Sequence, residues 1–368
     1  MTDTTKITAD DYAYLNLLRG ASIIRVMLVH LGLSWFYPPY SYYIGIFFPL
    51  LFFISGAVSY TSFKKHKNIT IHLKKRAIET LVPYYVFSVL VVTLGFTLGH
   101  NYISSTDSIL RWLLVSPNLS QVEIPIGQIW FIKTLIIIHL VSSFVFKLAD
   151  YFKQAVMAAF LISLFAVIGN DITQFKDRLF ENQLIQLLGP DALWNSIALL
   201  SCYLAGSLFY SAGFSLRQHR LATCLAFSML AVVGLYLTGF NSDFNFHFMQ
   251  KNLFYVATAI SVTTALFVVQ KPLFHLIKHM KPIEKLLLFS NAHSYALFLL
   301  HTVILFYVER VMSWQDLSGN YGLAIARMLL VITLSLCVAP YFSRLTKAIT
   351  KKLLQEHAVL RKKTNRTL

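Results

Sequence analysis

The chain has 368 residues, of which 56% carry hydrophobic side chains and only 13% are charged. A soluble domain has about 25% charged residues, so this balance excludes an ordinary soluble protein and fits one that has lipid as its solvent. The net charge is +16. The Lys and Arg residues that produce it lie between the hydrophobic segments, so we expect no nucleic acid partner. The three cysteines lie inside apolar stretches, so they indicate neither a disulfide framework nor a metal site.

Apolar stretches long enough to cross a bilayer recur along the whole chain. They cover residues 12–36, 42–63, 77–98, 128–148, 155–169, 193–212, 221–239, 253–270, 292–312 and 322–345. No short apolar core with a small-residue cleavage site precedes them, so we expect no removable signal peptide. The sequence predicts an all-α integral membrane protein, a bundle of about ten transmembrane helices in one domain over 1–368. The bundle occupies about 12–345, and a basic tail follows at 346–368.

The connections between these segments alternate in charge. Basic residues follow every second segment, beginning with Lys64, Lys65, Lys74, Lys75 and Arg76 and continuing with Lys147, Lys153, Arg217, Arg220 and Lys278. The other connections carry acidic residues such as Asp107, Glu123, Asp171 and Asp243. Because cytoplasmic loops are rich in Lys and Arg, both termini are predicted to be cytoplasmic, with membrane lipid as the partner of the positive charge.

The first segment holds the densest set of polar groups at membrane depth. Arg19 and His30 are eleven residues apart, which places them within about 20° of one face of an ideal helix and roughly 16 Å apart along it. One reading is an anion site at Arg19 and acid/base chemistry at His30; the other is a headgroup contact and a packing histidine. Arg25 projects about 120° away from Arg19, and the sequence assigns it no role.

Later segments add fewer candidates. Ser55 and Gly56 permit close helix approach, and Arg76 with Glu79 begins the third segment. Trp130 is expected at the outer interface, where tryptophan is by default an anchor. His301, with Ser294 and Tyr295 before it, is a second intramembrane histidine, and the pair of histidines suggests a cavity that handles protons.

Taken together, these segments resemble the transmembrane acyltransferase-3 family over nearly the whole chain. The matching motifs are Arg19 with His30, Phe52-Phe53 with Ser55-Gly56, Arg76 ahead of Pro83, Gly127 with Trp130-Phe131, and Ser294 to His301 with Phe298 where tyrosine is common. Three positions depart from the family pattern: Asn16 replaces an Asp, Glu79 replaces a second Arg, and Gln128 replaces a His. The change at Glu79 weakens a phosphate clamp there, since a carboxylate repels phosphate.

The resemblance implies transfer of an acyl group, most often acetyl, from cytoplasmic acyl-CoA to a hydroxyl of a cell-surface or lipid-linked glycan, such as a polysaccharide or lipopolysaccharide. It implies acetyl-CoA as co-substrate, no metal, and a multi-pass protein of the bacterial inner membrane, in a form without a C-terminal hydrolase-like domain. His30 is the expected base or acyl carrier, assisted by Arg19. The expected substrate or acyl-CoA contacts are Arg76, Ser55, Gly56, Trp130, Tyr295 and His301.

A rival function is compatible with the polar residues alone. A multi-pass transporter or flippase for a lipid-linked or anionic substrate would also bury Arg and His among its helices. The acceptor, the length of the acyl group and the oligomeric state are not encoded in any motif that we recognise.

Overall fold

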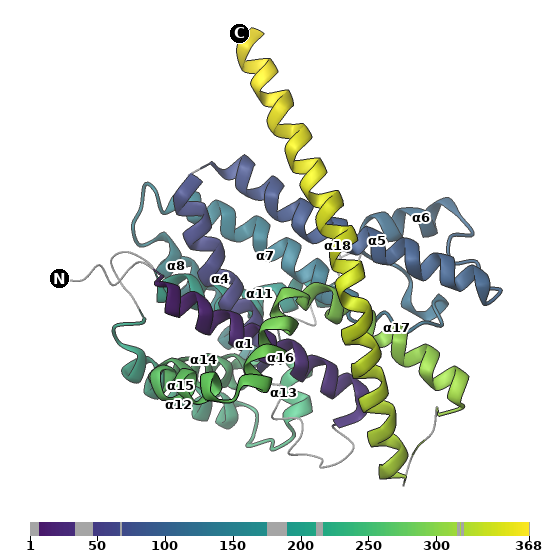
Figure 1. Cartoon of the computed structure of the whole chain (residues 1–368). Helices are drawn as coiled ribbons and strands as arrows, with labels where there is room; N and C mark the ends of the chain where they lie inside the picture. Colours follow the sequence, from purple (N-terminus) through teal and green to yellow (C-terminus); the bar gives the residue numbers. More distant parts are fainter. Residues whose placement is uncertain are drawn as a thin grey trace. The chain divides into compact units, whose positions relative to one another are not determined.

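The computed structural model of the chain describes residues 7–33, 47–66, 68–174, 190–210, 216–314, 317 and 320–367. Every regular element within these residues is helical, as Figure 1 shows. The chain divides into two compact groups of helices, one formed by Met1–Ile69 and Ile137–Ala292, the other by Thr70–Ile136 and His293–Leu368. Each group is described by itself below.

The first group contains most of the helices. They are α1 (Ala9–Leu28), the π-helical turn η1 (Val29–Leu33), α4 (Phe47–His66), α8 (Ala155–Thr173), α11 (Pro190–Phe209), α12 (Arg220–Leu237), α13 (Phe244–Gln250), α14 (Leu253–Val268), α15 (Gln270–His279) and α16 (Lys281–Ala292). The second group contains α5 (Ile69–Thr97), α6 (Thr106–Leu113), the 3₁₀ turn η3 (Leu119–Gln121), α17 (Ser294–Met312) and α18 (Tyr321–Thr367). Helix α7 (Ile129–Leu148) contributes its first half to the second group and its second half to the first.

The prediction of an all-α membrane protein is confirmed. Within the described residues, eight helices are long and apolar enough to cross a bilayer, and α14 with α15, bent by 71° at their junction, makes a ninth if the two count as one span. The predicted segment 42–63 is described only in part, and its described helix is α4 (Phe47–His66), which ends in Lys64, Lys65 and His66. Residues 34–46, which include the predicted ends at 36 and 42, lie outside the described part of the chain.

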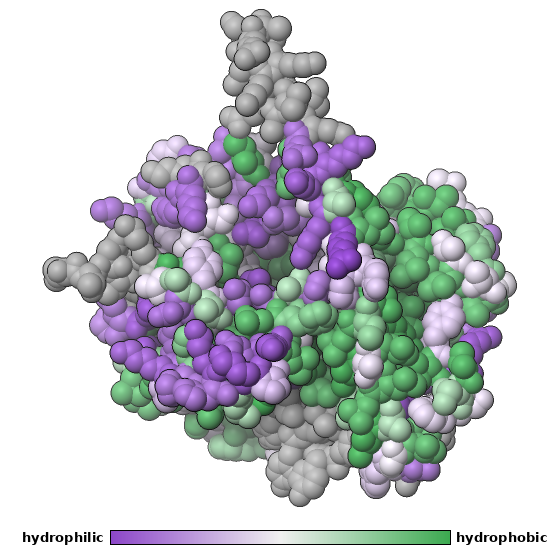
Figure 2. All heavy atoms as spheres, in the orientation of Figure 1, coloured by the Kyte–Doolittle hydropathy of each residue, from purple (hydrophilic) through white to green (hydrophobic). Residues whose placement is uncertain are grey.

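The last helix, α18, is one continuous ribbon in Figure 1 and extends through the predicted basic tail to Thr367. Its first part exposes apolar side chains such as Leu329, Val338 and Leu345. Basic residues follow at Lys347, Lys351 and Lys352. Figure 2 shows this change along the helix, from hydrophobic to hydrophilic, which is the pattern of a helix that leaves the hydrocarbon at about residue 345.

Glycines bring α4 and α11 into backbone contact. A Cβ atom on Gly56 would lie 1.8 Å from the carbonyl oxygen of Tyr203, and one on Gly206 would lie 1.9 Å from that of Phe53. The hydroxyl of Ser207 donates to the carbonyl oxygen of Gly56 at 3.2 Å. Small residues of this kind allow close helix packing in a membrane, where the hydrophobic effect does not drive helices together.

Polar contacts in the first group join connections that the charge pattern assigns to one side of the membrane. The carboxylate of Asp11, which is 1% exposed, accepts from Arg217 at 2.8 Å and from Gln270 at 3.1 Å. These contacts join the start of α1, the connection before α12 and the start of α15, all of which are predicted to be cytoplasmic. Lys64 and Asp150 join two more such connections, at 3.3 Å.

Connections with the opposite assignment also meet one another. Asp171, at the end of α8, accepts a hydrogen bond at 2.7 Å from the backbone N–H of Leu253, which begins α14. The indole N–H of Trp194 in α11 donates to the carbonyl oxygen of Gln250 at 2.8 Å. The connections of the first group therefore fall into two sets, and the contacts described above join members of the same set.

In the second group, contacts also join segments that the charge pattern assigns to the same side of the membrane. Arg310, at the end of α17, pairs at 2.7 Å with Glu123 in the connection between α5 and α7. His293 precedes α17, and the charges of Arg344 and Lys347 in α18 act on it. Burial lowers the pKa of His293, and these two cations lower it further, so its imidazole is neutral at pH 7.

Substitution of the packing glycines tests the α4–α11 contact. We expect Gly56→Ala to reduce the stability of the detergent-solubilised protein by about 1–3 kcal/mol, because its Cβ would meet a backbone carbonyl that has no flexible side chain to move aside. Gly169→Ala in α8 is the matched control, since nothing lies within 4 Å of its Cβ position, and alanine favours a helix over glycine. Thermal unfolding measures both variants; equal melting temperatures for the two would contradict the contact.

Candidate active site

Helix α1 positions Arg19 and His30. A capping box fixes its start, in which Thr8 and Asp11 satisfy each other's backbone N–H groups. The helix is regular as far as Leu28 and then widens into the π-helical turn of η1, where Gly32 has a φ of 103°. His30 lies on this turn and is exposed, whereas Arg19 is half-buried. Turns of this type occur frequently at functional sites.

The π-helical turn changes the predicted relation between the two residues. The estimate that Arg19 and His30 share one face assumed 100° per residue throughout, but from Val29 onward each turn contains more residues. The ideal-helix calculation therefore applies only as far as Leu28. No pattern in the sequence distinguishes this turn from a continuing α-helix.

Arg25 lies near both His30 and Tyr255. The charge of Arg25 acts on both the imidazole of His30 and the phenol of Tyr255 in α14. The Nε atom of Arg25 is buried and has no hydrogen-bond partner among the described residues. A cation with an unused buried donor beside an accessible imidazole is suited to stabilise negative charge that develops on a reacting group. No motif assigned Arg25 a role, because only the fold shows which residues it approaches.

Arg19 lies at a close contact between α1 and α16. Its neighbour Gly20 approaches the backbone of Leu287, where an added Cβ would lie 2.0 Å from the carbonyl oxygen. The remaining candidates of the first group, Ser55 and Gly56, are in α4. Gly56 is buried against Tyr203 of α11 and Ser55 is half-buried, so the structure gives the glycine a packing role whether or not this segment also contacts substrate.

The candidates of the second group begin with Arg76 in α5. Its guanidinium pairs with Glu79 at 3.2 Å, and Lys75 approaches the same carboxylate at 3.9 Å. An incoming phosphate must therefore compete with Glu79 for Arg76. This agrees with the expectation that glutamate at this position weakens a phosphate clamp.

The start of α7 is attached to α17. The side-chain amide of Gln128 donates to Thr302 Oγ1 at 2.7 Å and to the carbonyl oxygen of Leu299 at 3.2 Å. The ring of Phe131 lies 4.7 Å from that of Phe298, centroid to centroid. Trp130, which lies between Gln128 and Phe131 in the sequence, is half-buried.

Tyr295 and His301 are in α17. The hydroxyl of Tyr295 donates to the carbonyl oxygen of Thr80 in α5 at 2.8 Å. His301 is 0% exposed, and its Nδ1 lies 2.9 Å from the carbonyl oxygen of Leu297. Because a carbonyl oxygen only accepts, Nδ1 carries the proton in this contact. His301 is thus a buried, hydrogen-bonded histidine, in contrast to the exposed His30.

The structure also contains a buried ion pair that the sequence reading missed. Arg327 of α18 is 1% exposed and pairs with Glu309 of α17 at 2.5 Å; it also donates to the carbonyl oxygen of Trp314 at 3.0 Å. The available signal was an arginine five residues into the apolar segment 322–345. Breaking a buried pair of this kind is costly, because it leaves one uncompensated charge.

The structure therefore distributes the predicted residues over both groups. Arg19, His30, Ser55 and Gly56 belong to the first group, and Arg76, Trp130, Tyr295 and His301 to the second. Within the first group, the exposed imidazole of His30 can act as a base, and the nearby Arg25 supplies a cation. Among the described residues, no group of three or more His, Cys, Asp or Glu side chains could hold a metal ion.

Comparison with known proteins identifies the family. Residues 12–344 match the family model of acyltransferase 3, which is described as an acyltransferase domain. No curated protein and no solved structure matches the chain. The family match covers nearly the whole sequence and includes every candidate residue above. The chain therefore belongs to the acyltransferase-3 family and is a membrane-bound acyltransferase.

Proposed function

We propose that the protein transfers an acetyl group from acetyl-CoA to a hydroxyl of a cell-surface or lipid-linked glycan, with His30 as base or acyl carrier. The observation that supports this most is the position of His30. Its imidazole is exposed on a π-helical turn at the end of α1 and lies near the cation Arg25. Family membership supports acyl transfer in general, and the motif of Arg19 with His30 directs the proposal to this helix.

The chemistry requires a group that accepts a proton. A sugar hydroxyl is a weak nucleophile at neutral pH, so a neutral imidazole takes its proton as the oxygen attacks the thioester carbonyl. The C–S bond then breaks, CoA leaves as the thiolate, and the proton held by His30 neutralises it. In the other variant, His30 itself attacks the thioester and CoA leaves as the thiolate. The acetyl group then passes from the imidazole to the sugar hydroxyl, whose proton neutralises the thiolate. Arg25 is placed to stabilise the oxyanion that both variants form.

Cationic residues are the proposed contacts for the phosphates of CoA. Arg19 in the first group and Arg76 in the second are half-buried, and Lys74 and Lys75 add charge beside Arg76. Because Glu79 neutralises part of that charge, we assign the lysines a larger share than the family pattern implies. Trp130, Tyr295 and His301 remain proposed substrate contacts, with Trp130 as the candidate for stacking on a sugar ring.

We further propose that both termini are cytoplasmic, that the membrane is the bacterial inner membrane and that residues 1–368 form one acyltransferase domain. The charge pattern supports this orientation. It is also supported by contacts between connections assigned to the same side of the membrane, such as those of Asp11 with Arg217 and of Asp171 with Leu253. A transporter or flippase, the rival function, has no comparable support, since the family match favours transfer chemistry.

Labelling of single cysteines tests the orientation. We expect a membrane-impermeant maleimide to label Asn101→Cys in intact cells and to label Lys278→Cys only after permeabilisation. Both positions are exposed, and the charge pattern assigns them to opposite sides. The unsubstituted chain is the control, since its three cysteines lie inside apolar helices. Labelling of Lys278→Cys alone in intact cells would invert the proposed topology.

Substitution of His30 tests the reaction. We expect His30→Ala to reduce transfer of radiolabelled acetyl from acetyl-CoA to glycan by about 100-fold or more, the usual contribution of a general base. His279→Ala is the matched control, because His279 is exposed in α15 and is not itself a proposed substrate contact. Purified protein in lipid vesicles is used for both, with thermal unfolding to confirm equal folding. Equal transfer rates for the two variants would eliminate His30 as the catalyst.

A further inference from the structure

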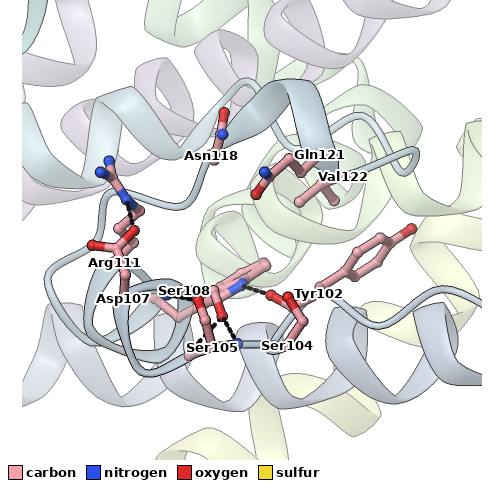
Figure 3. Close-up of a pocket in the computed structure, with 10 residues that line it drawn as sticks. Tyr102, Ser104, Ser105, Asp107, Ser108, Arg111, Asn118, Gln121 and Val122 are labelled. Carbon is pink, nitrogen blue, oxygen red and sulfur yellow. Dashed lines mark hydrogen bonds and ion pairs between the residues drawn. The ribbon is translucent and has the colours of Figure 1, made fainter.

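A polar pocket lies in the connection between α5 and α7. Its volume is about 280 Å³, near the lower limit of about 300 Å³ typical of ligand pockets. Figure 3 shows Asn118, Gln121 and Val122 along one side and Tyr102 with three serines along the other. The lining residues are Tyr102, Ser104, Ser105, Asp107, Ser108, Arg111, Trp112, Asn118, Gln121 and Val122. Most of them are exposed, so the pocket opens to the surface.

Hydrogen bonds to membrane helices fix the pocket walls. The hydroxyl of Tyr84 in α5 donates to the carbonyl oxygen of Trp112 at 2.6 Å. The indole N–H of Trp112 donates in turn to the carbonyl oxygen of Tyr102 at 3.3 Å. The Tyr102 ring fills the space over Gly95 of α5, where a Cβ would lie 2.3 Å from the ring. Lys133 of α7 donates to Ser116 at 2.7 Å. A pocket held in this way is formed before its ligand arrives, which reduces the cost of binding.

Helix α6, which forms one wall, is amphipathic. Its pocket-lining residues Asp107, Ser108 and Arg111 are polar, whereas Ile109, Leu110, Leu113 and the adjacent Leu114 are exposed and apolar. A helix with one charged face and one exposed apolar face lies in the membrane interface, with the apolar face in the lipid. The pocket is therefore at the level of the lipid headgroups, next to the bilayer.

The lining is polar but electrically balanced. The one cation, Arg111, is paired at 2.7 Å with the one anion, Asp107. Ser105 and Ser108 bond to each other's backbone. The side-chain amide of Gln121 makes no hydrogen bond among the described residues, so its donors and acceptor are available to a ligand. Hydroxyl and amide groups without net charge suit a neutral ligand rich in hydroxyls and do not favour a phosphate.

We propose that this pocket binds one sugar residue of a membrane-anchored glycan acceptor. The proposal rests on the proposed function, since it gives the acceptor a place to bind on the predicted outer side. The volume admits a single ring, the amide and hydroxyl groups match sugar hydroxyls, and the interfacial α6 places the pocket where the saccharide of a lipid-linked glycan lies. The pocket positions the acceptor and takes no part in the chemical step.

Direct binding measurements test the pocket independently of catalysis. The protein is reconstituted in phospholipid nanodiscs and probed by saturation-transfer NMR with methyl glycosides of glucose, galactose, mannose, rhamnose and N-acetylglucosamine. We expect at least one glycoside to bind, and the double variant Asn118→Ala, Gln121→Ala to weaken that binding by about tenfold. Leu119→Ala is the matched control, because this exposed residue lies between them and does not line the pocket. His30→Ala is expected to bind as the unsubstituted protein does.

The outcomes separate the pocket from the reaction. Equal binding in the double variant and the unsubstituted protein, or no binding of any glycoside, would overturn the pocket. Binding of glycerophosphoethanolamine alone would also overturn it and would indicate a phospholipid headgroup site. If glycosides bind in the pocket but the unsubstituted protein transfers no acetyl group to glycan, the pocket stands and the proposed function fails. Where transfer occurs, the double variant is expected to raise KM for the acceptor about tenfold with little change in kcat.

Discussion

The cost of an unpaired charge near hydrocarbon determines where the polar groups of this protein lie. Asp11 shows the effect most clearly, because a carboxylate that is 1% exposed is stable only through its bonds to Arg217, Gln270 and Thr8. Those bonds join three segments far apart in the sequence. Arg327 and Glu309 form a second such pair between α17 and α18. Arg25 beside His30 contrasts with these pairs, because its buried Nε atom has no hydrogen-bond partner among the described residues.

Much of the fold could be predicted because a bilayer imposes simple rules on composition. Apolar length located the spans, and the alternation of charge gave an orientation with which the contacts of Asp11 and Asp171 agree. The bend between α14 and α15 and the π-helical turn at Val29 were not predictable, because each depends on packing between elements. Gly56 illustrates the same limit: its motif was visible, but its approach to Tyr203 of α11 appears only in the fold.

The candidate site was predictable to a smaller extent. His30 and Arg19 could be predicted from their spacing and from the family pattern. The structure adds that His30 is exposed on a π-helical turn, as a residue that contacts a substrate must be. His301 looked equivalent in sequence, yet it is fully buried and bonded to Leu297. The pocket between α5 and α7 has no motif at all, since it is built from common polar residues whose meeting depends on Tyr84 and Trp112. The two proposals assign catalysis to the end of α1 and acceptor positioning to the pocket at the membrane surface.

We propose that the helices allow an acyl donor on one side of the membrane to react with an acceptor on the other. Sealed vesicles containing the purified protein test it directly, with radiolabelled acetyl-CoA trapped inside and glycan acceptor added outside only. We expect labelled glycan outside while a co-trapped soluble dye stays inside, and we expect His30→Ala to abolish that label. Labelled glycan that forms only when donor and acceptor share a compartment would contradict transfer across the membrane.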